Sequence, residues 1–124
     1  MKKTLLIVDD TPDITFTIKK LFEDVSGEYK VVISDSGEDC LKLIKEDFTP
    51  DVIILDIMLP GIDGWKTFEE IKKNDKWSKI PIIILTACSD DYTRGTGRHL
   101  GDDFIEKPFE FEDLKNKVEQ AISK

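Results

Sequence analysis

The segment from residue 51 to residue 64 constrains the fold of this chain more than any other. Its first half is a short apolar run rich in β-branched residues, bounded by Pro50 and by the Pro60-Gly61 turn. Such a run is typical of a strand buried on both faces, as in a parallel sheet covered by helices. Asp56 ends this strand, and α/β sheets bind ligands at the carboxyl edge of their strands. Taken alone, Asp56 is equally compatible with a residue that merely opens a turn.

Strands and helices alternate along the rest of the chain. Apolar runs predict four further strands, at residues 4–8, 29–33, 82–86 and 104–106. Apolar residues at helical spacing predict helices that begin near Pro12, Gly37, Gly64 and Phe111. This alternation predicts an α/β fold, with a parallel sheet covered by helices on both faces. We expect a single domain over residues 1–124.

The sequence evidence for a helix is strong in one segment and weak in another. For the first helix we expect Thr11 as the N-cap, Pro12 at the first position and Gly27 after the end. Its predicted apolar positions are Ile14, Ile18, Leu21, Phe22 and Val25. Residues 90–100, in contrast, contain two glycines, each of which costs about 1 kcal/mol in a helix interior. There we expect a short, frayed helix.

Composition excludes several classes of function. The chain has 124 residues and a formal net charge of −8, and its Lys and Arg residues do not cluster, which opposes direct nucleic-acid binding. No apolar run approaches the length of a membrane span, and Asp9-Asp10 interrupts the first run too early for a signal peptide. Cys40 and Cys88 lack metal or redox spacing, so we expect two free, half-buried thiols and a cytoplasmic location.

The predicted strands bring charged residues together. Asp9 and Asp10 follow the first strand, Asp56 ends the third, Thr86 ends the fourth and Lys107 follows the fifth. Three neighbouring carboxylates repel one another, and a divalent cation such as Mg²⁺ relieves the conflict with hard oxygen ligands. A carboxylate nucleophile with a metal ion and a lysine is suited to receiving a phosphoryl group.

These residues resemble the receiver domain of two-component response regulators, the CheY-like group, from end to end. The matching pieces are Asp9-Asp10, Asp56 with Leu59-Pro60-Gly61-x-Asp63-Gly64, Thr86-Ala87, Phe104 and Lys107-Pro108. Each piece is weak alone, but together they lie in the right order on the right elements. The resemblance implies a doubly wound, flavodoxin-like fold with strand order 2-1-3-4-5.

The resemblance also implies a role for each site residue. Asp56 is the expected phosphoacceptor and Lys107 the partner of the phosphoryl oxygens, while Thr86 and Phe104 form the conformational switch. Mg²⁺, or Mn²⁺ in its place, is held by Asp9, Asp10, Asp56 and the backbone carbonyl of Met58. Pro108 resembles the family's cis proline. His99 is expected to be a surface residue, and Cys88 to border the pocket and influence the entry of water.

By the same resemblance, the chain is expected to be a phosphorylation-dependent switch without an output domain. A sensor histidine kinase or a phosphotransfer protein donates the phosphoryl group, and a downstream protein reads the fourth helix, fifth strand and last helix. No enzyme activity is expected beyond the chain's own phosphorylation and dephosphorylation. Residues 99–103 and a shortened interval from Thr86 to Lys107 depart from the family pattern, so we expect an unusual partner surface.

Three other functions compete with this one. The main alternative is a receiver-like interaction module that no longer uses phosphate. An aspartate-nucleophile phosphohydrolase would need a second acid two residues after Asp56, where Met58 stands. A flavin-binding protein would need a phosphate loop after the first strand, where Asp9-Asp10 would repel the phosphate.

Overall fold

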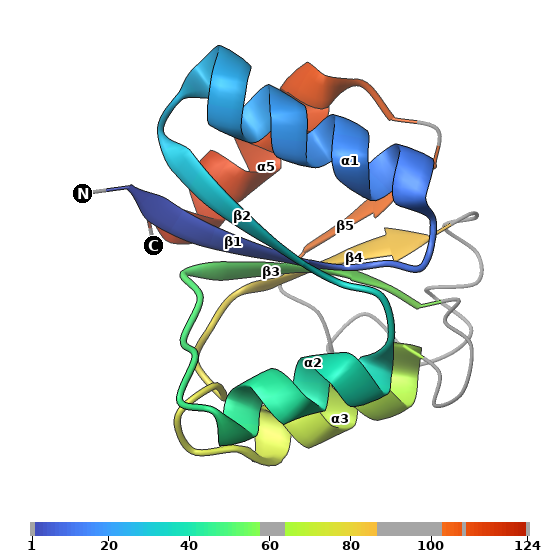
Figure 1. The fold of residues 1–124 in the computed structure, drawn as a ribbon, viewed down its shortest axis with the longest axis vertical. Coiled ribbons are helices and arrows are strands. Elements are labelled where there is room, and N and C mark those ends of the chain that lie inside the picture. Colours follow the sequence, from blue (N-terminus) through green and yellow to red (C-terminus); the bar gives the residue numbers. More distant parts are fainter. Residues whose placement is uncertain (1, 58–63, 87–102, 108, 124) are drawn as a thin grey trace.

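A computed structural model describes residues 2–57, 64–86, 103–107 and 109–123 of the chain. Within them, five parallel strands form one sheet in the order β2-β1-β3-β4-β5. The sheet runs across the middle of the molecule, with helices above and below it (Figure 1). The predicted α/β class, strand order and double winding are therefore confirmed.

The elements agree closely with the predicted positions. The strands are β1 (Lys3–Val8), β2 (Tyr29–Ser34), β3 (Val52–Asp56), β4 (Ile82–Thr86) and β5 (Asp103–Glu106). The helices are α1 (Pro12–Lys20), η1 (Leu21–Ser26), α2 (Gly37–Lys45), α3 (Gly64–Lys73) and α5 (Phe111–Ile122). Residues 90–100, where we expect a frayed helix, lie outside the described residues.

Two apolar cores lie on opposite faces of the sheet. Helices α1 and α5 cover one face, and α2 and α3 cover the other (Figure 1). Successive side chains of a strand point to opposite faces, so Leu5 and Ile7 of β1 enter the α1/α5 core, whereas Leu6 and Val8 enter the α2/α3 core. All five residues of β3 are buried. Burial on both faces explains why the central strands are continuous apolar runs rather than alternating ones.

The first helix differs from its prediction. Regular α-helix ends at Lys20 and continues as the π-helix η1, whose wider turn is closed by the bond from the Gly27 N–H to the Phe22 carbonyl. This change of pitch leaves Val25 70% exposed, so its predicted place on the apolar face is wrong. Gly27 ends the segment in the left-handed region as expected, with φ of 74°. Thr11 occupies the N-cap position, but its side chain makes no capping hydrogen bond with any described residue.

One packing contact and one smaller correction concern the α2/α3 side of the sheet. Phe48 lies beyond the end of α2, yet it still packs against the core. Cys40 is fully buried rather than half-buried, because it faces the sheet from α2. Burial and, second, the nearby charge of Asp39 raise the pKa of Cys40 to about 12, so the thiol stays protonated. Cys88 lies outside the described residues.

The structure also bears on membrane association. Among the residues described, no helix combines the length and the apolar character needed to cross a membrane.

Candidate functional site

The carboxyl ends of three strands deliver the charged residues to one edge of the sheet. β1 ends at Val8 directly before Asp9, β3 ends at Asp56, and β5 ends at Glu106 directly before Lys107. β1 and β3 are neighbours in parallel register, with Val8 opposite Leu55. The order of the strands therefore brings residues from the two ends of the sequence to one place.

Asp9, Asp10 and Asp56 form an acidic cluster. One carboxylate oxygen from each lies within 4.8 Å of one from each of the others. Asp9 and Asp56 are only 1% and 4% exposed, whereas Asp10 is exposed to solvent. Two buried like charges at such short range destabilise each other unless cations balance them.

Lys107 supplies one of the balancing charges. Its Nζ donates to Asp56 Oδ2 at 3.1 Å and to Asp9 Oδ2 at 3.4 Å. Burial alone would lower the pKa of the Lys107 ammonium, but hydrogen bonding and charge from Asp56, and then from Asp9, outweigh it and raise the pKa. The lysine is therefore a permanent cation between the two buried carboxylates.

Backbone contacts orient Asp9 within the acidic cluster. The Thr11 N–H donates to Asp9 Oδ1 at 2.9 Å, and the Asp9 N–H donates to the Ser34 carbonyl at 3.0 Å. These bonds join the end of β1 to the start of α1 and to the end of β2. Our sequence analysis missed the part played by Ser34, because no residue pattern marks a backbone carbonyl as a contact.

Gly64 makes the closest approach of α3 to the strand that carries Asp56. A Cβ atom at this position would lie 2.2 Å from Ile57 Cα and 2.5 Å from the Asp56 carbonyl oxygen. The Gly64 N–H donates to the Ile57 carbonyl at 3.1 Å. The sequence marked Gly64 as the start of a helix and as part of the family motif, and the structure adds that a glycine is needed for helix and strand to meet.

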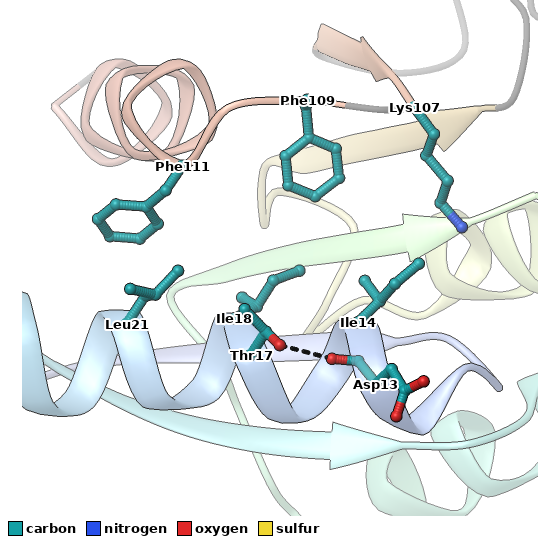
Figure 2. A pocket seen from close by; sticks show the side chains of 8 residues that line it. All are labelled: Asp13, Ile14, Thr17, Ile18, Leu21, Lys107, Phe109 and Phe111. Atoms are coloured by element: carbon teal, nitrogen blue, oxygen red, sulfur yellow. Dashed lines mark hydrogen bonds between the residues drawn. The ribbon is translucent and has the colours of Figure 1, made fainter.

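An apolar groove lies beside the acidic cluster, between α1 and the segment that joins β5 to α5 (Figure 2). It has a volume of about 470 Å³, within the range of ligand pockets. The residues that line it are Asp13, Ile14, Thr17, Ile18, Leu21, Lys107, Phe109 and Phe111. Lys107 thus borders the groove while its ammonium reaches the acidic cluster.

The acidic cluster fits a hard divalent cation. Three carboxylates against the one ammonium of Lys107 leave two negative charges, which a divalent ion would balance. The donors are carboxylate oxygens, and the exposure of Asp10 leaves room for the coordinated waters that Mg²⁺ retains. Asp9, Asp10 and Asp56 are the residues that would hold such an ion.

The remaining predicted site residues are described only in part. The Thr86 backbone lies at the end of β4, opposite Glu106 in register, but its side chain is not among the described features. Phe104 lies on β5, half-buried, and packs against the α2/α3 core. Met58, Cys88, His99 and Pro108 lie outside the described residues, so their predicted roles stay predictions.

Comparison with known proteins bears on this arrangement. The family model of the response regulator receiver domain matches residues 5–119. A probable transcriptional regulator, ycf27, of Guillardia theta is 38% identical over 122 residues, which are 98% of this chain and 46% of that protein. This chain thus spans about half the length of that curated relative.

Solved structures give the same result. The response regulator TrrA of Thermotoga maritima, solved in complex with Mg²⁺-BeF, is 34% identical with a TM-score of 0.83, over 98% of this chain and 99% of that one. The receiver domain of the sensor histidine kinase PA1611 from Pseudomonas aeruginosa, with magnesium in its active-site cleft, is 26% identical with a TM-score of 0.87, over the whole of both chains. On this evidence, the chain belongs to the family of response regulator receiver domains of two-component signalling.

Proposed function

We propose that this chain is a phosphorylation-dependent switch and that Asp56 is the residue that accepts the phosphoryl group. The observation that carries the proposal is the pairing of a buried Asp56 with Lys107 at 3.1 Å inside a cluster of three carboxylates. A carboxylate nucleophile, a fixed cation and a metal-binding set of oxygens are the parts that phosphoryl transfer to an aspartate needs.

In the proposed reaction, an Asp56 carboxylate oxygen attacks the phosphorus of a phosphohistidine on a sensor histidine kinase or a phosphotransfer protein. A P–O bond forms, the P–N bond breaks, and the imidazole nitrogen keeps the electron pair and takes up a proton. The Lys107 ammonium neutralises charge on the phosphoryl oxygens. Magnesium, or manganese in its place, would be held by Asp9, Asp10, Asp56 and the Met58 carbonyl and would supply further neutralisation of the same oxygens.

The proposal also covers how a partner protein senses the phosphorylation of Asp56. Phosphorylated Asp56 adds charge at the carboxyl edge, and Thr86 with Phe104 respond to it and bias a two-state surface. That surface comprises residues 90–100, β5 and α5, and a downstream protein recognises it. The chain catalyses no reaction beyond its own phosphorylation and dephosphorylation. The rival proposal is an interaction module of the same fold that does not use phosphate.

Intact-mass measurement with acetyl phosphate and magnesium tests the site directly. We expect a single, magnesium-dependent phosphoryl adduct on the unaltered chain and none on Asp56→Asn. Asp75→Asn is the matched control, because Asp75 is an exposed carboxylate in the turn after α3, and it should keep the adduct.

Each outcome of this experiment separates the proposals. Magnesium binding without an adduct would exclude acetyl phosphate as a donor and leave phosphohistidine as the donor to be tried. An adduct that persists on Asp56→Asn would show that another residue accepts the phosphoryl group. Neither an adduct nor magnesium binding would favour the phosphate-independent module.

A further inference from the structure

Among the described strands, β2 lies at an edge of the sheet, and no described strand pairs with its outer side. The Lys3 N–H donates to the Glu28 carbonyl, and the Asp9 N–H donates to the Ser34 carbonyl, so even-numbered residues of this segment turn their backbone groups towards β1. Alternation along a strand then turns the backbone N–H and carbonyl groups of three residues towards the outer side. These are Tyr29, Val31 and Ile33.

The composition of β2 favours pairing with a further strand. Its sequence, Tyr-Lys-Val-Val-Ile-Ser, contains β-branched and aromatic residues, a single charge and neither proline nor glycine. Edge strands of this kind are templates for strand addition unless something protects them. Ile33 is 37% exposed, and Phe16 on the neighbouring helix α1 is 65% exposed, so apolar surface lies on the same side of the fold.

Two side chains cover the middle of the outer edge. Glu23 Oε2 accepts a hydrogen bond from the Val31 N–H at 2.8 Å. Lys19 Nζ donates to the Val31 carbonyl at 3.0 Å and to Glu23 Oε2 at 3.1 Å. We call this ring of Lys19, Glu23 and the Val31 backbone the edge latch. It occupies both backbone groups that a further strand would need at Val31.

The π-helix η1 carries the acidic half of the edge latch. Within it, Phe22 is fully buried and its ring lies 5.0 Å from those of Tyr29 and Phe111, while the next residue, Glu23, faces β2. The hydrogen bond from Val31 and, less strongly, the contact with Lys19 lower the pKa of Glu23 against the opposing effect of burial. The carboxylate therefore stays charged and holds Lys19 in place.

We propose that the edge latch prevents β2 from pairing with a further strand, and that opening it turns β2 into a surface that binds a second copy of this chain. The second copy is the occupant because the edge is self-complementary. Antiparallel pairing centred on Val31 sets Tyr29 opposite Ile33 and Lys30 opposite Val32, with no like charges face to face. A two-fold axis through Val31 would join the two sheets at this edge.

Amide hydrogen exchange and sedimentation velocity test the proposal in two variants, Glu23→Ala and Lys19→Met. At low concentration, where Glu23→Ala is still monomeric, its Val31 amide should exchange about tenfold faster, because it loses a hydrogen bond to a charged group. The Val32 amide faces β1 and should not change, so it serves as the internal reference. Both variants should form dimers as concentration rises, whereas the unaltered chain stays monomeric.

Two further variants control the experiment. Glu70→Ala removes an ion pair on the surface of α3, in which Lys66 Nζ lies 3.4 Å from Glu70 Oε1. It should leave the exchange of the Val31 amide and the sedimenting mass unchanged. Ile33→Lys places a charge on the edge and should return Glu23→Ala to a monomer. Glu23→Ala and Lys19→Met variants that stay monomeric at all concentrations would overturn the proposal, even with faster exchange at Val31. Unchanged exchange at Val31 in monomeric Glu23→Ala would overturn it as well, and so would dimers that survive Ile33→Lys.

Discussion

The two faces of the sheet are built from the same kinds of residues but are closed in different ways. On the α2/α3 face, Trp77 is fully buried, its Nε1 donates to the Phe48 carbonyl at 2.8 Å, and the two rings are in edge contact. On the α1/α5 face, Phe109 and Phe111 are only half-buried and border a groove of about 470 Å³. Among the described residues, the α2/α3 face encloses Trp77 completely, whereas a groove runs beside the acidic cluster on the α1/α5 face.

The difference separates two demands on the site. On the α2/α3 side, Gly64 fixes the backbone at Asp56, because α3 meets β3 there with no space for a side chain. On the α1/α5 side, Lys107 borders the groove while its ammonium pairs with Asp56 and Asp9. In the reaction proposed above, the fixed backbone would hold the nucleophile, and the groove would border the cation that pairs with it.

The largest expected effect is the loss of Trp77. Trp77→Ala leaves a cavity in the α2/α3 core and an unpaired Phe48 carbonyl, so it should lower the free energy of unfolding by about 3–5 kcal/mol. Urea denaturation followed by circular dichroism measures this. A loss of less than about 1 kcal/mol would show that the core around Trp77 is not tightly packed.

The next effect is the crowding at Gly64. Gly64→Ala brings a methyl group against the Ile57 and Asp56 backbone, and we expect a cost of about 3 kcal/mol, at the upper end for an overpacked site. Magnesium affinity should also fall, because the end of β3 must shift. Gly27→Ala is the control, since no described atom lies within 4 Å of the added methyl group. It should cost about 1 kcal/mol through its positive φ alone and leave magnesium affinity unchanged.

Shortening a side chain beside the groove on the α1/α5 face should cost less stability. Phe109→Ala removes a half-buried ring from the border of the groove, so we expect a loss of only about 1 kcal/mol in the free energy of unfolding. The same denaturation experiment, run beside Trp77→Ala, measures the contrast between the faces. Equal losses in the two variants would contradict the comparison, because the groove would then be packed as tightly as the opposite core.

The sequence predicted most of what the two faces share. Apolar runs ending in Asp9 and Asp56, together with the order of elements, predicted the sheet and the acidic edge. The difference between the faces was not accessible, because helical spacing shows which residues turn inward but not how completely neighbouring elements cover them. Val25 was misplaced for a related reason, since the π-helix changes the pitch of a segment whose spacing suits a regular helix. Contacts made by backbone groups, such as Ser34 with Asp9 and Glu23 with Val31, have no residue signature at all.

The smallest expected effect is a difference in stability at low pH between two charged pairs, one from each side of the sheet. The pKa of Glu23 is lowered first by its hydrogen bond from Val31, and that of Glu70 first by the charge of Lys73. A carboxylate whose pKa falls on folding stabilises the fold above its unfolded pKa, and this contribution disappears as pH drops through the folded value. Both pairs should therefore weaken below the ordinary glutamate value of 4.5.

Glu23 holds a strand backbone, whereas the partners of Glu70 in the described part of the chain are lysines along α3. The two carboxylates should therefore differ in how much stability is lost at low pH. We expect the free energy of unfolding to fall less in Glu23→Gln than in the unaltered chain between about pH 5.5 and about pH 3.5. Glu70→Gln should follow the unaltered chain more closely, because exposed pairs contribute little. Urea titrations at the two pH values measure both slopes. Identical slopes for the two variants would mean that the bond to Val31 adds nothing beyond a surface ion pair.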